Sequence, residues 1–367
     1  MKGSIKFVQA ERSAFFPTLK KRVEQYFRDN HIDHHANAKM VVKTIVLLTA
    51  YITPFVAMLL LDLPVWVNLI CWIIMGLALA GIGMSIMHDA NHGAYSSSKK
   101  VNTLMGYTLN LAGASVFNWK LQHNILHHTY TNVVHYDEDI DDKGFMRFSP
   151  HTRRKKYQSL QVIYAFLFYS VITLYWVVAK DLLQFIRYTK NGVNPNKPKE
   201  NVITFLKISA VKIGYLFVIL FVPIYVAELP WLQVISGFLI MHGVAGIILT
   251  VIFQLAHTVE GTSHPLPNES GNIENDWAIH QLNTTVNFSP DSKILTWYLG
   301  GLNHQVEHHL FPRICHVHYP AISKIVKETC NEFGVPYLEN KTFMQALRSH
   351  IRTLKRFGRI DPELAQM

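Results

Sequence analysis

The sequence has little charge for its length: 16% of its 367 residues are Asp, Glu, Lys or Arg, whereas 49% are hydrophobic. Its mean hydropathy is positive. It also has no internal repeat of fixed period and no low-complexity segment. Because a soluble protein of this length carries more charge, the composition excludes an ordinary soluble protein and indicates several membrane-spanning segments.

Cysteine and acidic residues are scarce as well. The three cysteines, Cys71, Cys315 and Cys330, show no CxxC spacing, so neither a disulfide framework nor a zinc knuckle is indicated. The 25 acidic residues against 35 Lys and Arg leave a net charge of +10. These basic residues flank apolar runs and form no patch interleaved with aromatic residues, so we predict contact with the lipid bilayer and no nucleic-acid partner. Residues 1–40 lack the apolar core of a cleavable signal peptide.

Four apolar runs are about long enough to cross a bilayer, since roughly 20 residues of helix span its core. They comprise residues 41–61, 65–87, 210–227 and 231–253. Within each pair, the short connection, 62–64 or 228–230, contains no Lys or Arg, whereas basic residues flank the other ends. By the positive-inside rule, we predict both connections outside and both termini in the cytosol.

Three histidine clusters have the spacing of metal ligands on helices. They read HDANH at 88–92, HNILHH at 123–128 and QVEHH at 305–309. Residues i and i+4 project from one face of an α-helix, so His88 with His92, and His123 with His127, can each hold one metal ion. An adjacent histidine such as His128 points about 100° away and can reach a neighbouring ion. We therefore predict two metal ions close together.

The number of histidines favours iron over zinc. With His257, which follows the fourth apolar run, the clusters supply more ligands than the three or four of a zinc site. Imidazole also suits iron, and two irons with open positions for O2 can attack an unactivated C–H bond. We predict a non-haem diiron centre with O2 as co-substrate. The predicted ligands, which would also be the catalytic residues, are His88, His92, His123, His127, His128, His257, His308 and His309.

One metal centre requires all clusters on one side of the membrane, so an even number of spans must separate His128 from His257. A fifth apolar run, residues 160–178, should then lie in the interface, which its Tyr and Trp content favours. The predicted fold is an all-α membrane protein with four transmembrane helices in two hairpins, interfacial helices and a cytosolic helical domain that carries the diiron site. The predicted segments are 1–40 (cytosolic), 41–87 (first hairpin), 88–207 (first two clusters), 208–254 (second hairpin) and 255–367 (third cluster).

Metal-bound histidines need hydrogen-bond partners for their second ring nitrogen. We predict this role for Asp89, Asn132 and Asp137, with Glu307 as a further candidate. A solvated loop is an equally good interpretation of the acidic string that contains Asp137. That string extends to Asp141 and Asp142.

Gln305 begins the third cluster and should line the site, whereas the adjacent His304 would face another direction on a helix. His242 lies inside the fourth apolar run and has either a packing or a functional role. Lys212, in the third run, should extend toward the cytosol. The histidines outside the clusters are predicted to be solvated, with His280 the best further candidate for the site; they are His31, His34, His35, His135, His151, His264, His280, His316 and His318.

The three clusters resemble the histidine boxes of the integral-membrane fatty acid desaturases. The flanking segments HHTYTN, WAIHQLNTTVNF and GGLNHQVEHHLFP are similar to that family as well, and the resemblance covers almost the whole chain. The Gln at the start of the third box resembles the front-end branch. Members of that branch insert a double bond between an existing one and the carboxyl end, or act on sphingoid bases.

The resemblance implies an enzyme that uses O2 and electrons to insert a cis double bond, Δ5- or Δ6-like, into a fatty acyl-CoA or an acyl-lipid. The residues before the first run lack the His-Pro-Gly-Gly motif of a fused cytochrome b5 domain. We therefore expect a separate ferredoxin, flavodoxin or cytochrome b5 and a bacterial inner membrane. Hydroxylation or acetylenic-bond formation on an acyl chain or sphingoid base would use the same oxidant, and a histidine-rich metal transporter is a more distant alternative.

Overall fold

The computed structural model describes residues 5–8, 13–140 and 144–360, so Asp141 and Asp142 lie outside the described residues. Within these ranges the chain is predominantly helical and contains no closed sheet. The strands form two short parallel pairs, β1 (Lys6–Phe7) with β2 (Asn272–Ile273) and β3 (Asn287–Phe288) with β4 (Glu339–Asn340). The prediction of a mostly helical protein is confirmed.

The chain divides into two compact units, each assembled from separate stretches of sequence. The first unit comprises Met1–Ala36, Gln122–Ala165 and Ile252–Met367, and the second comprises Asn37–Leu121 and Phe166–Val251. Two helices, α8 (Gln161–Tyr175) and α11 (Trp231–His257), begin in one unit and end in the other. The polypeptide therefore enters and leaves the second unit twice.

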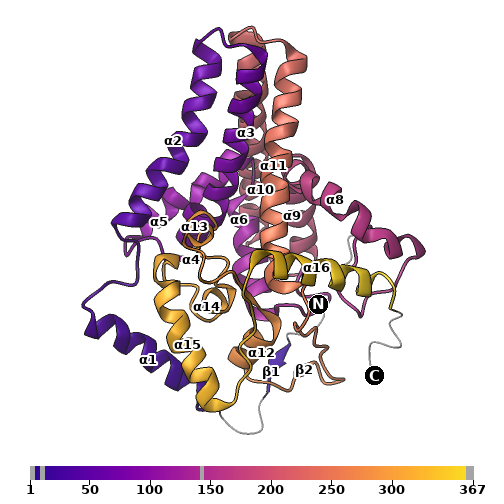
Figure 1. Cartoon of the computed structure of the whole chain (residues 1–367). Coiled ribbons are helices and arrows are strands. Elements are labelled where there is room, and N and C mark those ends of the chain that lie inside the picture. The colour runs from indigo at the N-terminus through magenta and orange to yellow at the C-terminus, as the bar shows by residue number, and fades with distance from the viewer. Residues whose placement is uncertain (1–4, 9–12, 141–143, 361–367) are drawn as a thin grey trace. The chain divides into compact units, whose positions relative to one another are not determined.

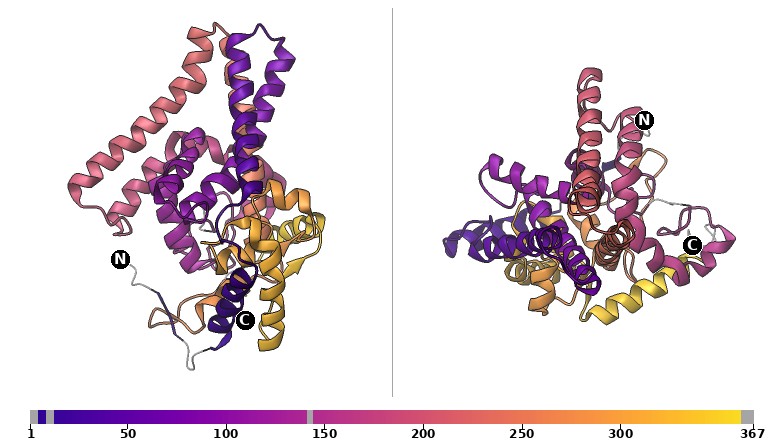
Figure 2. Two further views of the ribbon diagram at one scale, coloured as in Figure 1. Left: turned by 90° about the vertical axis from the view of Figure 1, so that its left-hand side faces the viewer. Right: turned by 90° about the horizontal axis from the view of Figure 1, so that it is seen from above.

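Long apolar helices dominate the second unit. Helices α2 (Ala38–Leu60) and α3 (Val65–Gly81) form an antiparallel hairpin, and α10 (Pro198–Leu216) continues as the π-helical η6 (Phe217–Val226) before the chain returns along α11 (Figure 1). Figure 2 shows α10 and η6 diverging from α11 below their shared turn. The other helices are η1 (Ile82–Ile86), α4 (Met87–His92), α5 (Lys99–Gly106), η2 (Tyr107–Ala112), α6 (Val116–Trp119), η5 (Trp176–Lys180) and α9 (Asp181–Lys190).

Glycine allows α3 and α11 to approach closely. A Cβ atom added to Gly76 would lie 2.6 Å from the carbonyl oxygen of Met241, and one added to Gly237 would overlap the ring of Trp72. Small residues serve this purpose between membrane helices, where close backbone packing replaces the hydrophobic effect as the source of association.

Five helices of the described chain are long and apolar enough to cross a membrane. They are Ala38–Leu60, Val65–His92, Lys156–Lys190, Pro198–Val226 and Trp231–His257. Four of them coincide with the predicted spans, and the fifth contains the run at 160–178. The chain is thus a membrane protein, as its composition predicts.

Lys212 of α10 does not extend toward water, so that prediction is wrong. It is buried, its Nζ lies 3.0 Å from the carboxylate of Asp181, and it donates to the carbonyl groups of Gly113, Trp176 and Val177. These acceptors replace water around the ammonium group, and removal of either partner would leave a buried charge.

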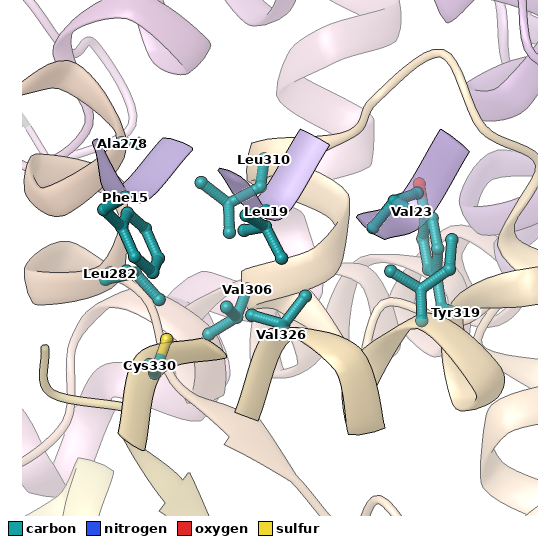
Figure 3. Packing of buried hydrophobic residues seen from close by; sticks show 11 residues of the cluster. Phe15, Leu19, Val23, Ala278, Leu282, Val306, Leu310, Tyr319, Val326 and Cys330 are labelled. Carbon is teal, nitrogen blue, oxygen red and sulfur yellow. The ribbon is translucent and has the colours of Figure 1, made fainter. Parts of the chain in front are cut away.

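The first unit is built around an apolar core between α1 (Phe15–Asp29) and α15 (Tyr319–Phe333). Figure 3 shows Phe15, Leu19 and Val23 of α1 facing Tyr319 and Val326 of α15. The other helices of this unit are η3 (Lys120–His127, from Gln122 on), α7 (His128–Tyr130), η4 (Lys156–Leu160), α12 (Trp277–Thr284), α13 (Lys293–Tyr298), α14 (Gln305–Leu310), η7 (His316–His318) and α16 (Phe343–Phe357).

Candidate metal centre

Six of the predicted ligands gather in the first unit. Helices η3 and α7 carry His123, His127 and His128, α11 ends at His257, and α14 carries His308 and His309. The ring nitrogens of His127, His257 and His309 can all lie within 4.8 Å of one another, as can those of His128, His308 and His309. Because His309 belongs to both groups, the two groups lie next to each other, and each could hold a metal ion.

The second histidine cluster lies on a π-helix, not on the α-helix assumed from its spacing. In η3, His123 stacks on His127 with ring centroids 5.2 Å apart, and Nε2 of His123 lies 3.2 Å from Nε2 of His128. A π-helix brings residues i and i+5 together, whereas an α-helix would turn them apart. His123 therefore lies beside both His127 and His128. His127 and His128 still belong to different groups of candidate ligands, which agrees with the expectation that His128 reaches a neighbouring ion.

Asp137 orients His127, as predicted. Its Oδ2 lies 3.0 Å from Nδ1 of His127, and it also accepts hydrogen bonds from the backbone N–H groups of Asn132 and Asp139. Burial alone would raise the pKa of Asp137, but the charge of His127 and these hydrogen bonds outweigh burial and lower it. Asp137 is fully buried, so the solvated-loop interpretation is wrong at this residue.

The two nitrogens of the His127 ring have different surroundings. Burial would lower its pKa, but the negative charge of Asp137 and its hydrogen bond outweigh burial and raise it. Within the described residues, Nε2 of His127 is buried and has no hydrogen-bond partner. A ring held by a carboxylate at one nitrogen, with the other directed into a cluster of imidazoles, is the arrangement of a metal ligand. The residues of this unit therefore fit a metal ion.

Polar groups that the sequence analysis did not identify hold three further rings. Nδ1 of His257 lies 3.2 Å from the carbonyl oxygen of Thr284, and Nδ1 of His309 lies 2.8 Å from Oε1 of Gln281. Nδ1 of His308 lies 3.3 Å from the hydroxyl of Tyr319. From the sequence alone, His280 is the best further candidate for the site. The structure shows that its neighbour Gln281 is the residue that reaches the cluster.

Gln305 lies against the cluster, as predicted. Its Nε2 is 3.0 Å from Nε2 of His257, and its side chain is buried. The preceding His304 is also buried but lies near Glu307, with 3.7 Å between Nδ1 and Oε2. The two neighbours thus face different surroundings, which agrees with their expected directions.

Glu307 and Asn132 bind groups around the cluster and not the rings for which they were predicted as partners. Glu307 accepts hydrogen bonds from the amide of Asn287 and the hydroxyl of Tyr337, and burial raises its pKa to about 7. Asn132 adopts a left-handed conformation with φ 59°, and its amide donates to the carbonyl groups of His257 and Thr284. Both side chains bind the framework of the site.

The first histidine cluster lies in the second unit. His88 and His92 occupy one turn of α4 with ring centroids 4.8 Å apart, and each packs edge-on against the indole of Trp119. Nδ1 of His88 is 4.0 Å from the buried carboxylate of Asp89. The predicted pairing of the two histidines on one helical turn is confirmed.

The remaining histidines divide by exposure. His31, His34 and His135 are exposed, as predicted. The prediction of solvation is wrong for three others, because α12 and η7 are packed inside the protein; these are His280, His316 and His318. Burial lowers the pKa of His280 to about 4, so its ring stays neutral.

Comparison with known proteins agrees with this geometry. Residues 64–341 match the family model described as fatty acid desaturase. The sn-1 linoleoyl-lipid 6-desaturases of Synechocystis sp. and Arthrospira platensis are each 35% identical to the chain; the alignments cover 97% and 95% of it and 98% and 94% of those proteins. An acyl-lipid (8-3)-desaturase of Physcomitrium patens is 36% identical over 97% of the chain and 74% of that protein.

Proposed function

Because the chain belongs to the fatty acid desaturase family, we propose that it is a membrane-bound front-end desaturase that inserts a cis double bond into a lipid-linked acyl chain. The buried histidine cluster of the first unit is the observation that carries this proposal. Relatives named 6-desaturase and (8-3)-desaturase, which align with nearly the whole chain, support the front-end position. Each turnover reduces one O2 to two waters, using the two hydrogens and two electrons of adjacent methylenes, two electrons from a separate donor and two protons from solvent.

We assign metal binding to the histidines of the first unit and keep His88 and His92 as ligands on the strength of their spacing. The ligands in the first unit are His123, His127, His128, His257, His308 and His309. Two iron ions bound by these imidazoles would activate O2 for the removal of hydrogen from unactivated C–H bonds.

The protein prepares these rings for metal binding. Asp137, Thr284 and Gln281 accept hydrogen bonds from Nδ1 of their histidines, which selects the tautomer with a lone pair at Nε2. Complete burial of His127, His257 and His309 excludes water from the rings and protects the reaction from side products. Gln305 reaches the same cluster and places an amide beside the ring of His257.

We further propose four spans with both termini and the histidine clusters in the cytosol. The hairpins at 41–87 and 208–254 would cross the membrane, residues 88–207 and 255–367 would carry the clusters, and the run at 160–178 would lie in the interface. A single metal centre that includes His128 and His257 requires an even number of crossings between them, and the short connections without Lys or Arg favour the outside, so both support this topology. Cysteines placed at Asp62 and Glu228 should react with a membrane-impermeant maleimide from outside intact cells, and one at Lys197 should react only after lysis.

Product analysis in a defined host tests the function. Cells supplied with linoleic acid and expressing the chain should form an additional double bond on the carboxyl side, located by mass spectrometry of derivatised fatty acids. Separation of lipid classes after a short pulse should place the product first in membrane lipid, whereas first appearance in acyl-CoA would show the other carrier. Detection of hydroxylated or acetylenic products alone would contradict desaturation.

Metal content gives a readout independent of activity. Purified protein should contain about two irons per chain, and His127→Ala should lower this content and abolish the product. His135→Asn is the matched control because His135 lies in the same segment but is exposed. Full iron content and full activity in His127→Ala would overturn the assignment of the site.

A further inference from the structure

Helix α16 carries one continuous cationic face. Its charged residues are all Lys or Arg, and no Asp or Glu occurs between 343 and 357. At 3.6 residues per turn, the four cations within the helix lie within about 100° of its surface, and one further cation precedes the N-cap and another follows the C-cap. This cationic face consists of the exposed residues Lys341, Arg348, Arg352, Lys355, Arg356 and Arg359.

Most of this charge has no acidic partner among residues 5–8, 13–140 and 144–360. Arg352 pairs with Glu260 at 3.4 Å, with both side chains more than half exposed. Among the described residues, Arg348, Lys355 and Arg356 form no ion pair. Like charges on one face repel each other, so binding a partner of opposite charge on this face is favourable.

The opposite side of α16 is fixed to the first unit. Leu354 and Phe357 are buried, and the buried guanidinium of Arg147 donates to the carbonyl groups of Phe357 and Ile360 at the end of the helix. Gln161 donates to the carbonyl of Leu354 at 2.7 Å. The cationic face is therefore held on a rigid support.

This inner side contacts the segment that follows His257. The imidazole of His350 donates from Nδ1 to the carbonyl of Thr258 at 2.8 Å, and the hydroxyl of Ser349 accepts from the backbone N–H of Glu260 at 2.8 Å. A helix with its side chains is about 10–12 Å across. A protein docked on the outer side of α16 would thus lie about one helix diameter from the residues next to His257.

We infer that the cationic face of α16 docks an acidic one-electron carrier protein, a role that rests on the desaturase function proposed above. Charge complementarity and the hydrogen bonds between α16 and the segment that follows His257 favour this partner. A helix that lies in a membrane surface inserts an apolar face into lipid, whereas α16 turns its apolar face into the protein core. The carrier docks twice per turnover, is oxidised by one electron each time, and supplies the two electrons that complete the reduction of O2 to water.

Charge reversal on this face tests the inference. The variant Arg348→Glu/Lys355→Glu/Arg356→Glu is compared with Lys20→Glu/Lys21→Glu/Lys324→Glu, which reverses three exposed cations on α1 and α15 of the same unit. Both variants change net charge equally, so a difference between them reports the location of the charge. Each is purified into phosphatidylcholine nanodiscs, and binding of a reduced, acidic [2Fe–2S] ferredoxin is measured in low salt and in 1 M salt.

The α16 variant should bind the carrier at least tenfold more weakly in low salt, and the difference should vanish in 1 M salt, where charges are screened beyond about 3 Å. Carrier-dependent desaturation should fall in parallel, whereas turnover driven by dithionite and methyl viologen, which need no docking face, should stay unchanged. The neutral variant Arg348→Gln/Lys355→Gln/Arg356→Gln should show an intermediate loss with unchanged iron content, which separates docking from misfolding.

Equal loss in both reversal variants, or no loss in the α16 variant, would overturn the inference. An effect seen only in nanodiscs that contain anionic phosphatidylglycerol would overturn it as well and assign the face to lipid. The protein could bind the carrier through α16 and yet form no double bond with any reductant. That result would support the docking face and reject the proposed function.

Discussion

Replacement of Asp137 by Asn should weaken iron binding without removing the fold. The carboxylate accepts three hydrogen bonds, from Nδ1 of His127 and from the N–H groups of Asn132 and Asp139. An amide keeps one oxygen and turns an NH2 group toward at least one of these donors. The charge-assisted bond to His127 becomes a neutral bond of about half its strength or is lost.

Loss of such a partner typically lowers metal affinity 10–100-fold, which is about 1.4–2.7 kcal/mol. The amide facing a buried donor also costs about 1–3 kcal/mol of stability. We expect both effects in purified protein, the first as iron lost at a 10–100-fold lower chelator concentration and the second as a lower midpoint of thermal unfolding.

Asp139→Asn is the matched control in the same loop. Its carboxylate is 3.8 Å from Nδ1 of His127, beyond hydrogen-bond distance, and its side chain is 21% exposed. Its backbone bond to Asp137 is unaffected by the change. We expect less than a threefold change in iron affinity for Asp139→Asn, on the order of 0.6 kcal/mol. Wild-type iron retention in Asp137→Asn, or an equal loss in both variants, would refute the role of Asp137 in orienting His127.

Three further predictions concern buried groups. Burial raises the pKa of Glu307 from 4.5 to about 7. The free energy of unfolding should therefore fall by about 3 kcal/mol as the pH rises from 4.5 to 7 and stay constant above pH 7. Glu307→Gln should therefore unfold at higher temperature than wild type at pH 8 and at a similar temperature at pH 4.5; no difference at pH 8 would contradict this. Gly76→Ala should destabilise the second unit by about 1–3 kcal/mol through overlap with the α11 backbone, whereas Gly243→Ala, whose Cβ meets nothing within 4 Å, should not lower the unfolding temperature. Lys212→Met should cost about 3–5 kcal/mol by leaving Asp181 unpaired, and Asp181→Asn in the same chain should restore part of the lost stability and yield; no restoration would contradict a buried ion pair.

The clustering of the histidines could be predicted from the sequence because metal binding would impose a regular spacing on residues of one type. The helix type of η3 was not, because His123, His127 and His128 have the same spacing on an α-helix and on a π-helix. The π-helix depends on which backbone hydrogen bonds form once the segment is packed. The sequence therefore predicted which residues cluster and not which of them face each other.

The partners of the rings were predictable only where their chemistry is distinctive. Asp137 was found because a carboxylate ten residues from His127 is an obvious acceptor. Gln281 and the carbonyl of Thr284 were missed because amides and backbone groups carry no local signature, and they reach the site only through long-range packing. Phe15, Leu19 and Val23 of α1 follow the i, i+4, i+8 spacing of a core helix, so the packing of this part of the cytosolic segment 1–40 could have been predicted from the sequence.

The discontinuous order of the two units sets the time at which the metal centre can mature. His123, His127 and His128 leave the ribosome long before His308 and His309, and both predicted membrane hairpins must be synthesised before the last segment of the first unit, which begins at Ile252. Contacts so far apart in sequence form late in folding. A nascent chain that ends before this segment holds His127 without His257 or His309, so the proposed iron site would stay incomplete until this last segment has been synthesised.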